Sequence, residues 1–220
     1  MLLGETTGLS EITFLTVRVT FTATVIAALA GIPLGYLMGT HEFRGRRIVI
    51  ALANTGMGLP PVVVGILVAL LLSRNGPFGA WTLIYTPAAI IVAQVVIALP
   101  IIAGLTAAGI QGLSGDMLVQ IRAMAAGRTR TMWLVLREAR ASLVAALLAG
   151  FGGAVSEVGA SMMVGGNIEG QTRVLTTAAV LETSKGNFGA AIGLGAVLLV
   201  LAFGVNLAGT LVQLGEAGRG

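Results

Sequence analysis

One acidic residue lies inside a long apolar stretch, and it is the first candidate for a chemical role. Glu157 lies within ASLVAALLAGFGGAVSEVGASMMV, residues 141–164, with the hydroxyl groups of Ser156 and Ser161 nearby. An ionisable side chain in such a segment is costly to bury and is by default a functional-site candidate. We expect Glu157 to act in a gate or in packing, protonated or hydrogen-bonded, rather than as a direct ligand.

Small and polar side chains recur at a spacing of four residues around Glu157, and this spacing defines two neighbouring faces of one helix. The first face is smooth enough for close helix packing and consists of Gly152, Ser156 and Ala160. The second face carries the polar groups and consists of Gly153, Glu157 and Ser161. We predict that the second face borders a pore near a gate.

The tandem Pro60 and Pro61 form the second candidate, inside the apolar residues 48–72. Two prolines remove backbone donors and break a helix, and in lipid the freed carbonyls need protein or water partners. The break is either a functional bend or a packed kink, and both readings stay open. Thr55, backbone amides freed at the break, Ser156 and Ser161 would be uncharged hydrogen-bond donors, unless each hydroxyl bonds its own helix.

Composition places these residues in a membrane protein. The chain is 56% hydrophobic and 10% charged, whereas soluble domains average about 25% charged. The alternating segments of a transmembrane barrel are missing, so we expect an all-α integral membrane protein. The chain has no cysteine and one histidine, which excludes disulfides and leaves no metal-ligand cluster. The net charge of +4 comes from loops, so we expect no nucleic-acid partner.

Five apolar stretches are long enough to cross a bilayer within one transmembrane domain, residues 1–220. They cover about residues 12–38, 48–72, 88–110, 141–164 and 190–211. Arginines concentrate in the loops before residue 48 and within residues 114–140, which indicates that these loops are cytoplasmic. The segment 165–189 balances its charges and is expected outside. This topology places the N-terminus outside and the C-terminus in the cytoplasm.

The polar stretch from Ser114 to Arg140 is expected to dock a soluble partner. Asp116 can open a short helix, and Gly127 can end it as a left-handed cap. A second helix would begin near Thr129 or Thr131. An amphipathic helix presented in this way suits a groove on another protein.

In this stretch the chain resembles the permease subunits of type I ABC importers, whose cytoplasmic loop carries an EAA motif followed by a glycine. Ala123 matches the last alanine of that motif and Gly127 the glycine, with Ala126 and Arg128 on either side of Gly127. The chain departs from the motif at its acidic position, where it has Ile121. The resemblance implies that these residues couple the permease to an ATPase.

Two further stretches resemble oxyanion permeases. Residues 59–79, LPPVVVGILVALLLSRNGPFG, are similar to the second helix of molybdate, sulfate and tungstate permeases. Residues 154–188, AVSEVGASMMVGGNIEGQTRVLTTAAVLETSKGNF, are similar to the tungstate-type branch in particular. An unpaired carboxylate at Glu157 would repel an oxyanion, which again favours a gate or packing role.

The resemblance implies a MetI-like fold of five transmembrane helices with a cytoplasmic coupling helix. It also implies a homodimeric pore in the cell membrane, an external solute-binding protein and a pair of ATPase subunits that hold ATP and magnesium. The chain has no GxxxxGK[ST] motif, so it is expected to be no enzyme and to bind no cofactor itself. Tungstate is the expected substrate, with molybdate or sulfate as alternatives. A self-contained channel or secondary transporter and a scaffold without a pore are the competing classes.

Overall fold

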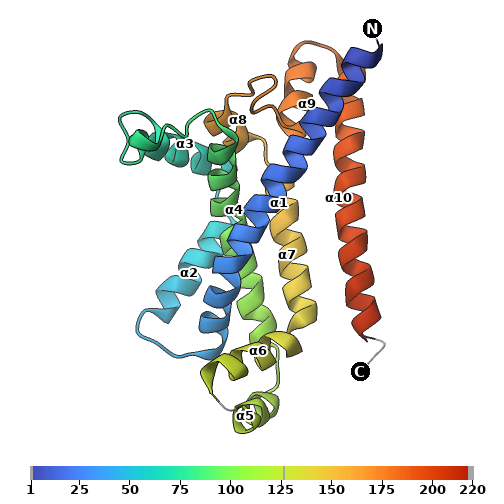
Figure 1. Cartoon of the computed structure of the whole chain (residues 1–220). Coiled ribbons are helices and arrows are strands. Elements are labelled where there is room, and N and C mark those ends of the chain that lie inside the picture. The colour runs from blue at the N-terminus through green and yellow to red at the C-terminus, as the bar shows by residue number, and fades with distance from the viewer. Residues whose placement is uncertain (1, 126, 218–220) are drawn as a thin grey trace.

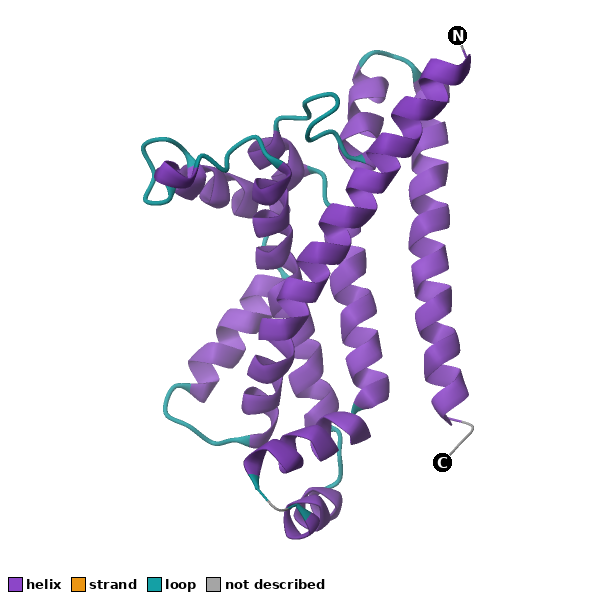
Figure 2. Ribbon diagram, viewed as in Figure 1, coloured by secondary structure: helices purple, strands orange, loops and turns teal. Residues whose placement is uncertain are grey.

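The computed structural model describes residues 2–125 and 127–217, and all regular structure in these two ranges is helical. Figure 2 shows helices joined by short loops. The elements are α1 (Leu2–Thr40), α2 (Arg46–Met57), α3 (Pro61–Leu72), a 3₁₀ turn (Gly79–Trp81), α4 (Pro87–Gln111), α5 (Gly115–Met124), α6 (Arg128–Glu138), α7 (Arg140–Val155), α8 (Gly159–Gly165), α9 (Leu175–Ser184) and α10 (Phe188–Ala217). The all-α class expected from the sequence is confirmed.

Three helices are long and apolar enough to cross a membrane alone, namely α1, α4 and α10. The other two expected spans are bent pairs: α2 and α3 meet at 107°, and α7 and α8 meet at 58°. The described chain therefore makes up to five crossings if each bent pair counts as one. The two ends of the chain lie at opposite ends of the molecule, and α5 and α6 lie at the C-terminal one (Figure 1).

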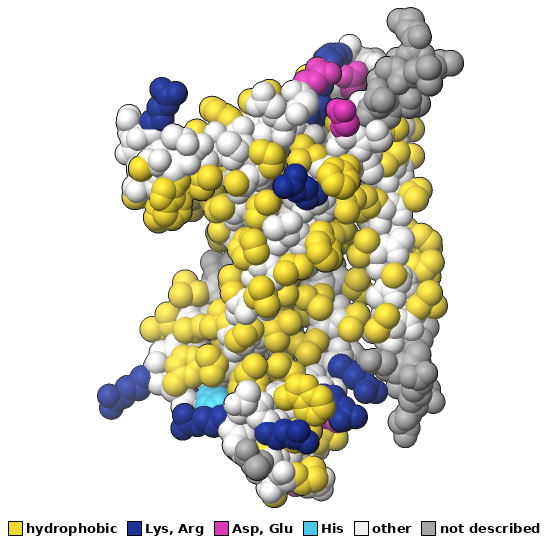
Figure 3. Space-filling view, viewed as in Figure 1, with side chains coloured by type: hydrophobic (Ala, Val, Ile, Leu, Met, Phe, Trp, Pro, Cys, Tyr) yellow, Lys and Arg dark blue, Asp and Glu magenta, His cyan; other side chains and the backbone are white. Residues whose placement is uncertain are grey.

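Charged side chains are distributed unevenly between these two ends. Basic side chains gather at the end formed by α5 and α6, whereas most acidic side chains on the visible face lie at the other end (Figure 3). The helix order places both arginine-rich segments, residues 41–47 including the start of α2, and the segment containing α5 and α6, at the same end (Figure 1). Both segments thus lie at the same end of the molecule, as they must if they share one side of the membrane.

The helix α4 is the centre of the core, and α1 crosses it closely. The contact is made by Gly31, Gly35 and Gly39, which recur every fourth residue and face α4. A β-carbon added at Gly35 would lie 2.6 Å from the carbonyl oxygen of Ala103, so only glycine allows this approach. Small residues of this kind bring helix backbones together in lipid, where no hydrophobic force drives helices to associate.

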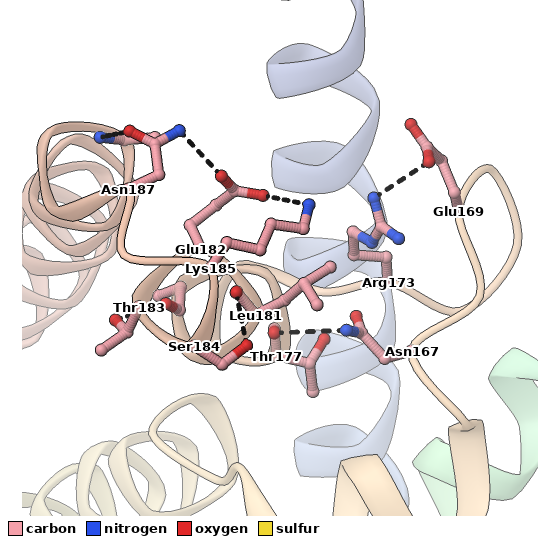
Figure 4. A network of polar contacts seen from close by, with 12 residues as sticks. Asn167, Glu169, Arg173, Thr177, Leu181, Glu182, Thr183, Ser184, Lys185 and Asn187 are labelled. Atoms are coloured by element: carbon pink, nitrogen blue, oxygen red, sulfur yellow. Dashed lines mark hydrogen bonds and ion pairs between the residues drawn. The ribbon is translucent and has the colours of Figure 1, made fainter.

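Hydrogen bonds connect α9 to the N-terminal part of α1 and to the start of α10. The backbone N–H of Leu175 donates to the hydroxyl of Thr16 on α1 at 2.9 Å. Figure 4 shows the polar contacts that continue toward α10, where Glu182 accepts hydrogen bonds from Lys185 at 2.8 Å and from Asn187 at 2.9 Å. These two bonds, Lys185 first, lower the pKa of Glu182, because they stabilise its ionised form. The connection from α9 to α10 is thus fixed by polar contacts.

Replacing Gly35 with alanine is expected to destabilise the α1–α4 crossing, because the added carbon would collide with the backbone of α4. Overpacking of a closely packed site costs about 1–3 kcal/mol. The melting temperature of the full chain in detergent measures this loss. Gly204 of α10 is the matched control, since a β-carbon there meets no atom within 4 Å. Equal melting temperatures for Gly35→Ala and Gly204→Ala would contradict the proposed role of the crossing.

Candidate functional site

The breaks in the two bent pairs lie side by side, because α3 packs against α8. A β-carbon at Gly65 of α3 would lie 2.7 Å from the Cα atom of Ala160 in α8. A β-carbon at Gly159 would lie equally close, 2.7 Å, to the side chain of Val62. These glycine contacts bring two stretches of non-helical backbone together within the apolar part of the fold. Backbone of this kind is tolerated at membrane depth only where protein or water satisfies it.

At the first break, the prolines begin α3 rather than interrupting one continuous helix. Pro60 is the extended residue before α3, and Pro61 is at its start, where a missing N–H costs little. The N–H of Gly58 donates to the carbonyl of Thr55 at 3.1 Å, and the carbonyl of Pro60 accepts from Val63 at 2.9 Å. The turn between α2 and α3 is therefore supported by its own hydrogen bonds.

The N-terminus of α3 is open in the single chain. Thr55, Pro60 and Pro61 are all exposed, and the hydroxyl of Thr55 has no partner within the described part of the chain. A helix N-terminus carries a partial positive charge and presents free N–H groups, which favours anions. Pro60 and Pro61 have no N–H, and the N–H of Val63 is bonded to Pro60. The donors left at the first break are therefore the hydroxyl of Thr55 and the N–H of Val62.

At the second break, Glu157 closes the N-terminus of α8 with its own carboxylate. Its Oε1 atom accepts a hydrogen bond from the N–H of Ala160 at 2.6 Å, and its side chain is buried. The carbonyl oxygen of Glu157 accepts a second bond, at 3.0 Å, from the hydroxyl of Thr176 in α9. Glu157 thus joins the break to α9, and the positive end of α8 is already occupied.

The prediction of one continuous helix with a packing face and a polar face is wrong at this point. The helix ends at Val155 and resumes at Gly159 after a bend of 58°, so a spacing of four residues across the break no longer defines a face. Ser156, expected in the packing face, is exposed and donates to the carbonyl of Gly152 at 2.8 Å.

Glu157 and Ser161, expected in the polar face, are both buried. The hydroxyl of Ser161 lacks a hydrogen-bond partner in the described structure. In the single chain, therefore, neither side chain reaches the surface.

The second candidate site is the turn between α5 and α6. Ser114 caps the N-terminus of α5, which starts at Gly115, because its hydroxyl accepts from the N–H of Met117 at 3.3 Å. The expected second helix, α6, starts at Arg128, next to Thr129. The prediction that Gly127 caps the first helix is wrong: α5 ends at Met124, and Gly127 is the residue before α6. Ala126 lies outside the described residues.

Gly127 nevertheless has a conformation that requires glycine. Its φ of 111° and ψ of 166° lie in a region that is almost closed to residues with a β-carbon. Its carbonyl accepts bonds from both the N–H and the hydroxyl of Thr131, each at 3.0 Å. The turn is therefore a fixed backbone shape, and Ala123 and Arg128 are exposed on either side of it.

The helices α5 and α6 pack against the end of α1 through an apolar cluster. Other apolar side chains of these helices are exposed. Ile121 and Val135 are buried together with Tyr36. On the outer surface, Val119 and Met124 are 65% and 71% exposed. An exposed apolar patch on a loop rimmed by arginines is typical of a protein interaction site.

Sequence reasoning missed two features of these sites. Trp133 lies between Arg130 and Arg137, whose guanidinium carbons are 5.5 and 5.3 Å from its ring centre. The spacing of three and four residues on a helix contains this signal. The bond from Thr176 to Glu157 has no comparable local signal, because the two residues meet only through the fold.

The described part of the chain contains no candidate metal site. Within residues 2–125 and 127–217, no group of three or more His, Cys, Asp or Glu side chains could hold a metal ion.

Comparison with curated proteins shows close similarity over nearly the whole chain. A probable anion ABC transporter permease protein of Haloferax volcanii is 42% identical, over 97% of this chain and 94% of that protein. The tungstate uptake system permease protein TupB of Peptoclostridium acidaminophilum is also 42% identical, over 89% of this chain and 86% of that protein. Both alignments are long enough to include α5, α6 and the two helix breaks.

Solved structures and family models agree with these relatives. An inward-facing structure of the MetNI methionine ABC transporter matches with a TM-score of 0.75 at 20% identity, over 93% of this chain and 94% of that chain, which establishes the fold. The model of the family described as "Binding-protein-dependent transport system inner membrane component" matches residues 31–214. The chain therefore belongs to the family of inner membrane components of binding-protein-dependent transport systems.

Proposed function

We propose that this chain is the pore-forming permease subunit of an ATP-driven importer for tungstate. The observation that carries the proposal is the 42% identity to a tungstate uptake permease over 89% of the chain. Molybdate and sulfate are the alternative substrates, since both are tetrahedral dianions like tungstate. The fold supports a transport role, because two adjoining apolar segments are broken and the side chains of Thr55 and Ser156 are exposed at the breaks.

The anion would pass the open N-terminus of α3. The hydroxyl of Thr55 and the backbone N–H of Val62, the first N–H group of α3 after the two prolines, offer uncharged donors at a positive helix end. Such donors bind an oxyanion weakly enough to release it, which conduction requires. Ser156 is exposed at the neighbouring break and could also contact the anion, whereas Glu157 and Ser161 are buried beneath that surface.

The permease would act as a dimer with an ATPase pair and an external solute-binding protein. Both α2 and α3 expose large apolar side chains, among them Leu52 at 66% and Leu70 at 62%, which suits contact with a second copy. The ATPase pair would hold ATP and magnesium and would receive the turn from Ala123 to Arg128. The arginine-rich end is then cytoplasmic, so the N-terminus is outside and the C-terminus inside.

Uptake of tungstate tests the proposed function directly. Cells without their own tungstate and molybdate uptake would express this chain together with its ATPase and binding-protein subunits, and cell-associated tungsten would be measured. We expect accumulation that excess molybdate reduces only weakly. Cells that carry the partner subunits without this chain are the control. No accumulation above that control would refute an importer of tungstate, and accumulation of sulfate instead would reassign the substrate.

Valine at Gly127 is expected to uncouple transport from ATP hydrolysis while the chain remains in the membrane. A β-branched residue at φ 111° costs about 1–3 kcal/mol, so the turn would change shape and uptake would fall about tenfold or more. Uptake and copurification of the ATPase are the measurements. Gly115→Val is the matched control, since Gly115 lies in the same loop with open space and an ordinary backbone. Normal uptake with normal copurification for Gly127→Val would remove the coupling assignment.

Removing the carboxylate of Glu157 is expected to loosen the second break. Glu157→Ala loses the cap of α8, which typically costs about 0.5–2 kcal/mol, whereas Glu157→Gln keeps an acceptor oxygen and should remain close to wild type. The melting temperature and the ATPase activity without binding protein report the two effects. The surface acid Glu169, with its side chain 84% exposed, is the control for loss of charge. Equal behaviour of Glu157→Ala and Glu169→Ala would show that the cap is unimportant.

A further inference from the structure

A long apolar groove runs between α1 and α10, with α7 at its back. In Figure 1, α1 and α10 lie close together at the N-terminal end and diverge toward the other end. The main hollow between them has a volume of about 630 Å³ and is lined by Phe21, Val25 and Leu29 of α1, Leu148 and Phe151 of α7, and Leu201 of α10. A second hollow of about 540 Å³ continues it toward the N-terminus, and Val17 lines both.

The shape of this groove does not suit another transmembrane helix. Helices approach each other closely in lipid where small residues recur on their faces. Such a row exists where α1 meets α4, at Gly31 and Gly35, whereas the groove side of α1 mixes the small Thr24 and Ala28 with the bulky Phe21, Val25 and Leu29. Bulky, irregular walls of this kind fit a flexible hydrocarbon chain that can follow the gaps between side chains.

A guanidinium lies on the same strip of α1. At about 100° per residue, Arg18 projects at an angle between those of Val25 and Leu29, and its side chain is exposed. It lies within the helix α1, which is long and apolar enough to cross a membrane. Within the described residues no carboxylate pairs with it, and Glu11 lies two turns away without an ion pair. A guanidinium within an apolar span must either pair with an anion or extend to the membrane surface.

We propose that this groove binds an anionic phospholipid from the leaflet on the N-terminal side, with one acyl chain in the hollow and its phosphate on Arg18. Guanidinium and phosphate form charge-assisted, often bidentate hydrogen bonds. The bound lipid fills the space that separates α1 from α10, which is otherwise packed mainly on α7 and α9. It therefore fixes the position of α10. The proposal concerns a surface distant from both candidate sites and does not depend on the substrate.

Native mass spectrometry of the purified full chain tests the proposal. After delipidation in mild detergent, the chain would be mixed with phosphatidylglycerol or with phosphatidylcholine, and the retained lipid would be counted. We expect about tenfold preference for phosphatidylglycerol, and Arg18→Gln should abolish that preference. Arg74→Gln, which removes an exposed arginine from the loop after α3, should not change it.

A groove-filling variant separates this site from general lipid binding. Leu29→Trp should reduce retention of both lipids, because Leu29 lines the hollow and is 74% exposed, so the larger ring can be accommodated by filling it. Ile192→Trp on α10, at a position 72% exposed and outside the hollow, should retain lipid normally. Equal retention of the two lipids by the wild type, or unchanged retention in Leu29→Trp, would overturn the proposal. So would a disulfide between two copies of Leu29→Cys, the only cysteine in that variant, because a second copy would then occupy the groove.

Discussion

The fold depends on one constraint: backbone hydrogen bonds that are broken inside a bilayer must be replaced by the protein itself. Two spans are interrupted, and each interruption is repaired differently. At the α2–α3 break the chain places prolines where an N–H is dispensable and closes a short turn on itself. At the α7–α8 break a carboxylate replaces the missing carbonyls, because Glu157 accepts from the N–H of Ala160. Close glycine contacts then hold the two repaired breaks against each other.

This difference separates an accessible helix end from a sealed one. The N-terminus of α3 remains exposed and uncapped by a side chain, whereas that of α8 is filled. A charged residue in a membrane segment therefore need not touch the transported solute. Glu157 caps the backbone of α8, and the hydroxyl of Thr176 in α9 donates to the carbonyl of Glu157. The neighbouring Leu175 is bonded to Thr16 near the N-terminal end of α1.

The class of protein and the places of its helices followed from the sequence, because apolar length and arginine asymmetry depend on the bilayer rather than on particular contacts. The tandem prolines predicted a break for the same reason. The burial of Glu157 and Ser161 could not be predicted from the sequence. The bend of 58° changes the direction of the side chains after it, and no local sequence pattern indicates that angle. The role of Gly127 was assigned to the wrong helix end, because a positive φ serves a C-cap and a tight inter-helix turn equally well. The substrate came from resemblance and from relatives, not from any residue that recognises it.

The bend of 107° between α2 and α3 limits how much of the bilayer this span can cross. With 12 residues, α2 is about 18 Å long, little more than half of a hydrocarbon core of about 30 Å. Because α3 runs almost at a right angle to α2, it adds little length along the axis of α2. The two pieces of this span therefore cannot both run along the bilayer normal, and at least one of them must be strongly tilted away from it.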